Sequence, residues 1–157
     1  MKNLFSKIAL MTMTMVLVIT FASCGKHKGF TKDETGFYYK FYVENTDSAK
    51  LDKGSYVVFT HRLYTVDTVL FEDYPMEWMI QDPVFAGDLN DALLHLHNGD
   101  SVTLIFNADS FAHYYFGMDD FQPDLKEREI YIDLKVVAAF TSAQVLEMQQ
   151  KRNEEMA

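Results

Sequence analysis

The chain has 157 residues, of which 14 are lysine or arginine and 23 are aspartate or glutamate, so its net charge is −9. Such an acidic chain repels the phosphate backbones of DNA and RNA, which argues against nucleic acid as a partner. The length suits one folded domain.

The first 23 residues are typical of a signal peptide. Lys2 and Lys7 give a positive start, and residues 8–21 form an apolar run without a charge. Small residues follow and lead to Cys24. This order of a basic start, an apolar centre and a small-residue exit predicts export and cleavage. The apolar run is shorter than the roughly 20 residues that a transmembrane helix needs.

Cys24 is the only cysteine, so an intramolecular disulfide is excluded. The string Phe21-Ala22-Ser23-Cys24 resembles a lipobox, the motif at which bacterial lipoproteins are cleaved and acylated, although Phe21 replaces the usual leucine. The resemblance implies a lipid on Cys24 and a place in the cell envelope, on the outer membrane facing the periplasm. The alternative is an unmodified cysteine beside an ordinary cleavage site.

Residues 24–34 are interpreted as a polar tether between the lipid and the domain. Three basic residues, Lys26, Lys28 and Lys32, gather there beside the expected anchor. They face either anionic lipid headgroups or solvent, and the sequence leaves both alternatives open.

Strands are predicted on both sides of one helix. Composition and alternation indicate strands at 37–43, 55–64, 69–71, 76–80, 101–106 and 130–135. Between them, four apolar residues have the spacing of one helix face: Leu89, Ala92, Leu93 and Leu96. Asp88 is a suitable N-cap for this helix, and Asn98-Gly99 is expected to end it.

Two further segments complete the chain. Residues 107–126 are interpreted as a long connection, and Thr141 with Gln144 fits the capping box of a helical tail over 141–157. Because strands and helices do not alternate regularly, we expect an α+β domain over residues 35–140, with a curled antiparallel sheet wrapped on one central helix.

Seven short segments follow one another along the chain in a characteristic order and spacing: Glu34–Tyr39, Gly54–Val58, Leu70–Asp73, Pro83–Leu93, Asn98–Thr103, Ala108–Ser110 and Ile130–Leu134. Together they resemble an FKBP-type peptidyl-prolyl cis-trans isomerase domain, and more narrowly the bacterial lipoproteins that carry one. The resemblance implies an FKBP-like fold and rotation of X–Pro bonds in an apolar pocket, without a cofactor or metal.

Carried over by position, the resemblance implies a set of pocket residues. Phe71, Glu72 and Phe85 are catalytic candidates. The hydrogen-bonding flap tyrosine of the family has no clear match, and either Tyr114 or Tyr115 can take its place, with Tyr115 as the fourth catalytic candidate. Thr60, Met76, Val84, Leu89 and Ile130 are the candidates for peptide binding. Leu89 stands where the family has a tryptophan at the pocket floor, and Thr60 and Ile130 stand where aromatic residues are usual. Plain core packing is the alternative for each of these residues, and Trp78 is expected in the core.

Other chemistry finds little support. His95 and His97 are two residues apart, so on a helix they point to different sides and do not readily share a metal ion. The sequence therefore predicts an anchored isomerase that acts on proline-containing or apolar segments of exported proteins. The alternatives are a chaperone or assembly lipoprotein with the same fold and a degenerate pocket, and a lipoprotein of another fold.

Overall fold

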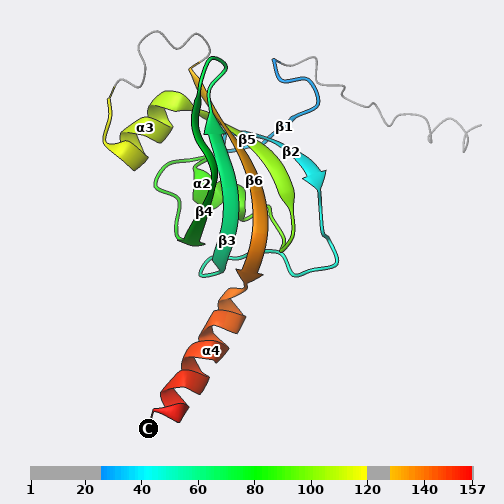
Figure 1. Cartoon of the computed structure of the whole chain (residues 1–157), viewed down its shortest axis with the longest axis vertical. Helices are drawn as coiled ribbons and strands as arrows, with labels where there is room; N and C mark the ends of the chain where they lie inside the picture. Colours follow the sequence, from blue (N-terminus) through cyan, green and yellow to red (C-terminus); the bar gives the residue numbers. More distant parts are fainter. Residues whose placement is uncertain (1–25, 120–127, 157) are drawn as a thin grey trace, which may run out of the picture.

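The computed structural model describes residues 26–119 and 128–156 (Figure 1). The expected signal peptide, Cys24 and residue 157 lie outside this part. The elements are β1 Thr31–Lys32, β2 Tyr38–Val43, β3 Tyr56–Tyr64, β4 Val69–Met79, α2 Leu89–Leu93, β5 Ser101–Asn107, α3 Ala108–Phe116, β6 Glu129–Phe140 and α4 Ser142–Glu155. The α+β architecture is confirmed, with a C-terminal helix after the sheet.

Six antiparallel strands form one sheet in the order β1-β2-β5-β6-β3-β4. Alternate side chains of the central strands point to the same face. On β3, Val57, Phe59 and Leu63 are buried, whereas Arg62 between them is exposed. This alternation places the apolar core on the face of the sheet that α2 covers, because residues two apart on a strand share a face.

Strand β4 is continuous where two separate pieces were predicted. Pro75 lies within it and pairs with Thr60 of β3. Strand β4 is an edge strand with a neighbour on one side only. Proline, which has no N–H to donate, is tolerated in such a strand.

Helix α2 begins as predicted and ends earlier. Asp88 caps it, accepting a hydrogen bond from the Asp91 N–H at 3.0 Å. After Leu93 the chain tightens into turns, in which the His95 and Leu96 N–H groups bond to carbonyls three residues back. The four apolar residues of the predicted face are all buried, so their spacing was correct although the helix is only five residues long.

We expect Leu93→Ala to lower the free energy of unfolding by about 2–5 kcal/mol, because the leucine side chain is fully buried between α2 and the sheet. Urea unfolding followed by circular dichroism measures the loss. Leu146→Ala is the matched control, since Leu146 is exposed on α4. A loss at Leu93 no greater than at Leu146 would show that the core is placed wrongly.

The connection expected at 107–126 contains a helix, α3, which corrects the prediction. The Asn107 side chain accepts a hydrogen bond from the Ser110 N–H at 2.9 Å and caps its start. Gly117, with φ of 65°, ends it in the left-handed conformation. The helix turns Phe111 and Tyr115 toward the core face of the sheet.

The described part of the expected tether is folded onto the sheet. β1 pairs with β2, and the Lys26 and His27 side chains each lie 3.0 Å from Glu129 at the start of β6. These residues of the expected tether are therefore held against the sheet.

Helix α4 projects from the end of β6, away from the body of the domain (Figure 1). The predicted capping box of Thr141 and Gln144 is present, and none of the helix residues is buried. Within residues 26–119 and 128–156, no helix has the length and apolar character to cross a bilayer.

Candidate functional site

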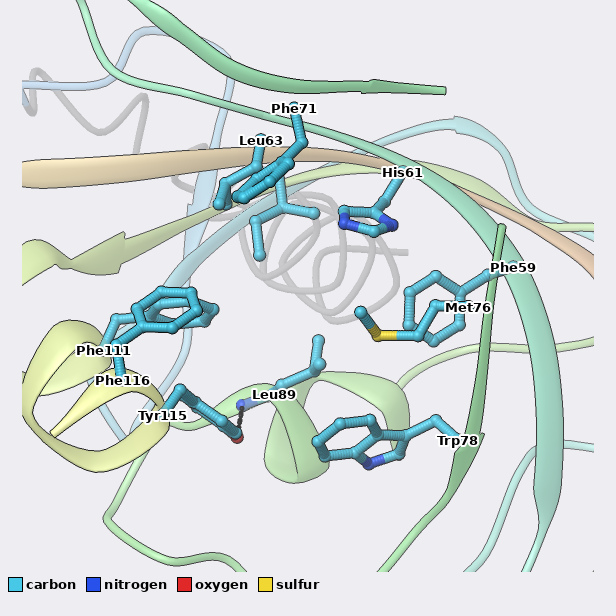
Figure 2. A pocket seen from close by; sticks show the side chains of 11 residues that line it. Phe59, His61, Leu63, Phe71, Met76, Trp78, Leu89, Phe111, Tyr115 and Phe116 are labelled. Atoms are coloured by element: carbon cyan, nitrogen blue, oxygen red, sulfur yellow. Dashed lines mark hydrogen bonds between the residues drawn. The ribbon is translucent and has the colours of Figure 1, made fainter. Parts of the chain in front are cut away.

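A cavity of about 370 Å³ lies between the inner face of the sheet and the two short helices (Figure 2). Its sheet side is built by alternate residues of neighbouring strands, so each strand presents one face to it. The residues on this side are Phe59, His61 and Leu63 of β3, Phe71, Met76 and Trp78 of β4, and Ile132 of β6.

The opposite side comes from the helices. Leu89 of α2 and Phe111, Tyr115 and Phe116 of α3 complete the wall. Phe111 and Tyr115 are one helical turn apart, and their ring centroids are 4.7 Å apart. The cavity therefore has aromatic rings on both sides and few polar atoms.

Trp78 forms aromatic surface at the base of the cavity, beside Leu89 (Figure 2). Its indole N–H donates to Asn90 Oδ1 at 3.0 Å, and Asn90 is buried in α2. This hydrogen bond fixes the plane of the ring. The expectation that Trp78 belongs to the core is only half right, since the residue is partly exposed and lines the cavity.

Tyr115 turns its ring into the cavity, but its hydroxyl is committed to α2. The hydroxyl donates to Asp88 Oδ2 at 3.2 Å and accepts the Leu89 N–H at 3.3 Å. Burial, and then the charge of Asp88, raise the pKa of the Tyr115 hydroxyl far above its ordinary value. The group stays protonated at neutral pH, with its proton directed at Asp88 rather than at the cavity.

Four of the nine predicted pocket residues line the cavity: Phe71, Met76, Leu89 and Tyr115. Phe71 pairs with Leu63 of β3 and is exposed, whereas Leu89 is buried and lies across the cavity from them (Figure 2). The roles assigned to them by resemblance stay predictions, but the structure brings the four together.

The other five do not line it. Thr60 lies on the outer face of β3, because its neighbours Phe59 and His61 point inward. Glu72 likewise points outward from β4 and lies 3.5 Å from Arg62. Ile130 is fully buried in the core, and Ile132, two residues later on β6, reaches the cavity in its place.

Val84 and Phe85 lie in the loop before α2. Val84 is exposed, and its N–H donates to Asp88 Oδ2 at 2.9 Å. Phe85 stacks on Tyr114 with ring centroids 4.9 Å apart and meets the edge of Tyr115 at 6.2 Å. Phe85 and Tyr114 therefore pack beside Tyr115 on the α3 side of the cavity, and neither of them lines it.

Sequence reasoning missed seven lining residues, and two simple signals identify most of them. Alternation along β3 marks Phe59, His61 and Leu63 as one face. The spacing of Phe111 and Tyr115 marks one helix face, once α3 is recognised. Within the described parts of the chain, no three His, Cys, Asp or Glu side chains are grouped so as to hold a metal ion.

No protein-family model matches the chain, and no curated protein sequence matches it. Solved structures do. FkpA from Escherichia coli superposes with a TM-score of 0.56 at 15% identity, covering 74% of this chain and 54% of its own. A peptidyl-prolyl cis-trans isomerase from Pseudomonas syringae gives 0.52 at 12%, covering 73% and 83%. The N-terminal domain of FKBP42 from Arabidopsis thaliana gives 0.51 at 15%, covering 74% and 95%.

These likenesses establish an FKBP-like fold, as the resemblance in sequence implied. This chain corresponds to about half the length of FkpA, so the activity of that whole protein does not transfer with the fold.

Proposed function

We propose that this chain binds proline-containing or apolar peptide segments in the cavity and speeds the cis–trans isomerisation of X–Pro bonds. The observation that carries the proposal is the aromatic cavity of about 370 Å³, set between the sheet and helices of an FKBP-like fold. Its proposed substrates are exported proteins that are still folding.

The chemistry needs no covalent step. Rotation about an X–Pro bond is slow because amide resonance resists it, with a barrier of about 18–20 kcal/mol. An apolar cavity removes water from the carbonyl and favours the twisted amide, in which that resonance is lost. Trp78, Phe71 and Met76 supply the surface against which a proline ring would rest.

A second candidate is peptide binding with little or no catalysis, as a chaperone or assembly factor would use it. The engagement of the Tyr115 hydroxyl favours this candidate, because a hydroxyl that donates to Asp88 and accepts the Leu89 N–H does not reach a bound peptide. Glu72 also lies outside the cavity and cannot orient the substrate from there. Apolar contact alone still provides binding, since its strength follows buried area.

We expect Phe71→Ala to weaken peptide binding and any isomerase activity about tenfold, because truncating this aromatic ring removes about 1.5 kcal/mol of apolar contact. Phe71 is 53% exposed, so the domain should stay folded. Trp78 is the only tryptophan, and its fluorescence reports occupancy of the cavity when a proline-containing peptide is added.

The matched control is Phe140→Ala, a change of the same residue type at the far end of β6 beside α4. Both variants and the wild type are compared in fluorescence titration, in peptide isomerisation and in suppression of aggregation. Binding without isomerisation would select the second candidate. Binding that Phe71→Ala leaves unchanged would place the site elsewhere.

We further propose that lipid on Cys24 holds the domain at the cell envelope. Cys24→Ala is then expected to abolish labelling by radioactive palmitate and to alter the membrane fractionation of the protein, because the acyl chains contribute about 0.8 kcal/mol for each buried CH₂. Phe21→Leu, which restores the usual lipobox residue, should keep the label. Unchanged labelling in Cys24→Ala would contradict the lipoprotein proposal.

A further inference from the structure

The start of the described chain is fixed close to the proposed lipid anchor. His27 is largely buried, and its Nε2 atom lies 3.0 Å from Glu129 on β6, the carboxylate that also pairs with Lys26. Cys24 precedes Lys26 by two residues, which span about 7 Å at most when fully extended. A lipid on Cys24 would therefore hold this corner of the sheet close to the bilayer surface.

The outer face of the sheet at this corner is both aromatic and basic. We call it the tyrosine face and define it by Phe30, Lys40, Tyr42, Arg62, Tyr64 and Tyr131. The Lys40 ammonium lies 5.9 Å from the Phe30 ring and 5.3 Å from the Tyr42 ring. Tyr64 and Tyr131 stack at 5.3 Å, with Arg62 5.2 Å from the Tyr64 ring.

This face is continuous with the anchored corner. The His27 ring lies 6.1 Å from the Phe30 ring and 6.5 Å from the Tyr131 ring. Tyr42, at the far side, is 61% exposed. The tyrosine face thus extends from the corner beside the proposed anchor to the exposed Tyr42, all on the outer side of the sheet.

The tyrosine face carries several cations, although the chain as a whole is acidic. Two nearby carboxylates are paired with cations: Glu129 with Lys26 and His27, and Glu72 with Arg62. Asp133 accepts hydrogen bonds from the hydroxyls of Tyr64 at 3.2 Å and Thr103 at 2.5 Å. Asp67 is exposed at the tip of the loop between β3 and β4. Among the described residues, Lys28, Lys32 and Lys40 make no ion pair.

We propose that the tyrosine face lies on the surface of a bilayer that contains anionic lipids, an inference that rests on the lipid anchor proposed above. Tyrosine rings suit the interface, because one end is apolar and the other carries a hydroxyl for water or headgroups. Lys28, Lys32 and Lys40, which make no ion pair with the described residues, attract anionic headgroups that lie within a Debye length. The acidic remainder of the domain is repelled by the same headgroups, which favours this orientation.

The orientation has a consequence for the cavity. On β3, Arg62 and Tyr64 belong to the tyrosine face, whereas Phe59, His61 and Leu63 line the cavity. The two features lie on opposite sides of one sheet. With the tyrosine face on the lipid, the cavity is directed away from the bilayer, toward exported proteins.

The test uses the mature lipidated chain in vesicles of phosphatidylcholine, with or without phosphatidylglycerol. Because lipid occupies the Cys24 sulfur, a cysteine introduced at another position is the thiol that a maleimide dye reaches. Tyr42→Cys places the dye on the tyrosine face, and Val84→Cys places it on the cavity side at a similar exposure of 57%. Lipids with nitroxide-labelled headgroups quench a dye that is close to the surface.

We expect quenching at position 42 to exceed that at position 84 severalfold with phosphatidylglycerol, and the difference to shrink without it. Lys32→Ser combined with Lys40→Ser should reduce the difference while the protein still floats with the vesicles. Equal quenching at the two positions in a protein that floats would overturn the inference and leave the anchor intact. Failure of the wild type to float would overturn the anchor, and the inference with it.

Discussion

Asp88→Ala is expected to lower the free energy of unfolding by more than about 3 kcal/mol, because one buried carboxylate connects three parts of the site. It accepts the Asp91 N–H at the start of α2 and the Val84 N–H of the preceding loop. The Asn90 amide at 3.0 Å and the Tyr115 hydroxyl at 3.2 Å donate to the same group. Alanine would remove the helix cap and leave several buried donors without an acceptor.

Asp82→Ala is the control, since Asp82 lies six residues earlier with an exposed side chain that pairs with Lys53. It should change stability by no more than about 0.5 kcal/mol. Urea unfolding compares the two variants, and Asp88→Asn measures the loss when the charge is removed and one accepting oxygen becomes an NH₂ donor while the side-chain size is kept. If Asp88→Ala were as mild as Asp82→Ala, the carboxylate would not organise the site as the contacts indicate.

The central helix was predictable because its local signals agree with its packing. Leu89 and Leu93 recur at helical spacing, and Asp88 precedes them as a cap. The length of α2 was not predictable from the same pattern. Leu96 keeps the buried position of a helix face although it lies in a turn, because its carbonyl accepts the Leu51 N–H from outside the helix. A tertiary contact thus replaces the next helical turn.

Helix α3 illustrates the opposite case, in which packing decides and propensity misleads. Its aromatic residues have only intermediate helix propensity, so the sequence of this segment is interpreted as an aromatic-rich loop. Phe111 and Tyr115 become helical because that conformation presents both rings to the cavity. The ends carried the readable signals, since Asn107 and Gly117 are a suitable N-cap and a suitable left-handed C-terminus.

The pocket was predicted less well than the fold, and the errors have one cause. Residues were carried over by matching strings, and on a strand an offset of one residue moves a side chain to the opposite face. Thr60 shows this error, since Phe59 and His61 beside it line the cavity. Trp78 shows the related limit: alternation places it on an inward face, but only the structure shows that this part of the face borders an open cavity.

Trp78→Leu is expected to reduce peptide affinity and isomerase kcat/KM about 30-fold. The resemblance in sequence predicts a site without an aromatic floor, because Leu89 stands where the family has a tryptophan. In the structure the Trp78 indole lies beside Leu89 and supplies flat apolar surface there (Figure 2). Losing on the order of 80 Å² of contact with a proline ring costs about 2 kcal/mol, which corresponds to that factor.

Trp78→Phe separates the ring from its hydrogen bond to Asn90. Phenylalanine keeps a flat surface but cannot donate to Asn90 Oδ1, so it should retain most of the affinity while losing some stability. Calorimetry measures binding in both variants, because neither retains the fluorescent reporter, and urea midpoints confirm that each is folded under the conditions used. A leucine variant that binds as tightly as the phenylalanine variant would mean that the indole packs against α2 without touching the peptide. Affinity lost in both, with stability unchanged, would mean instead that the indole N–H orients the ring for the substrate.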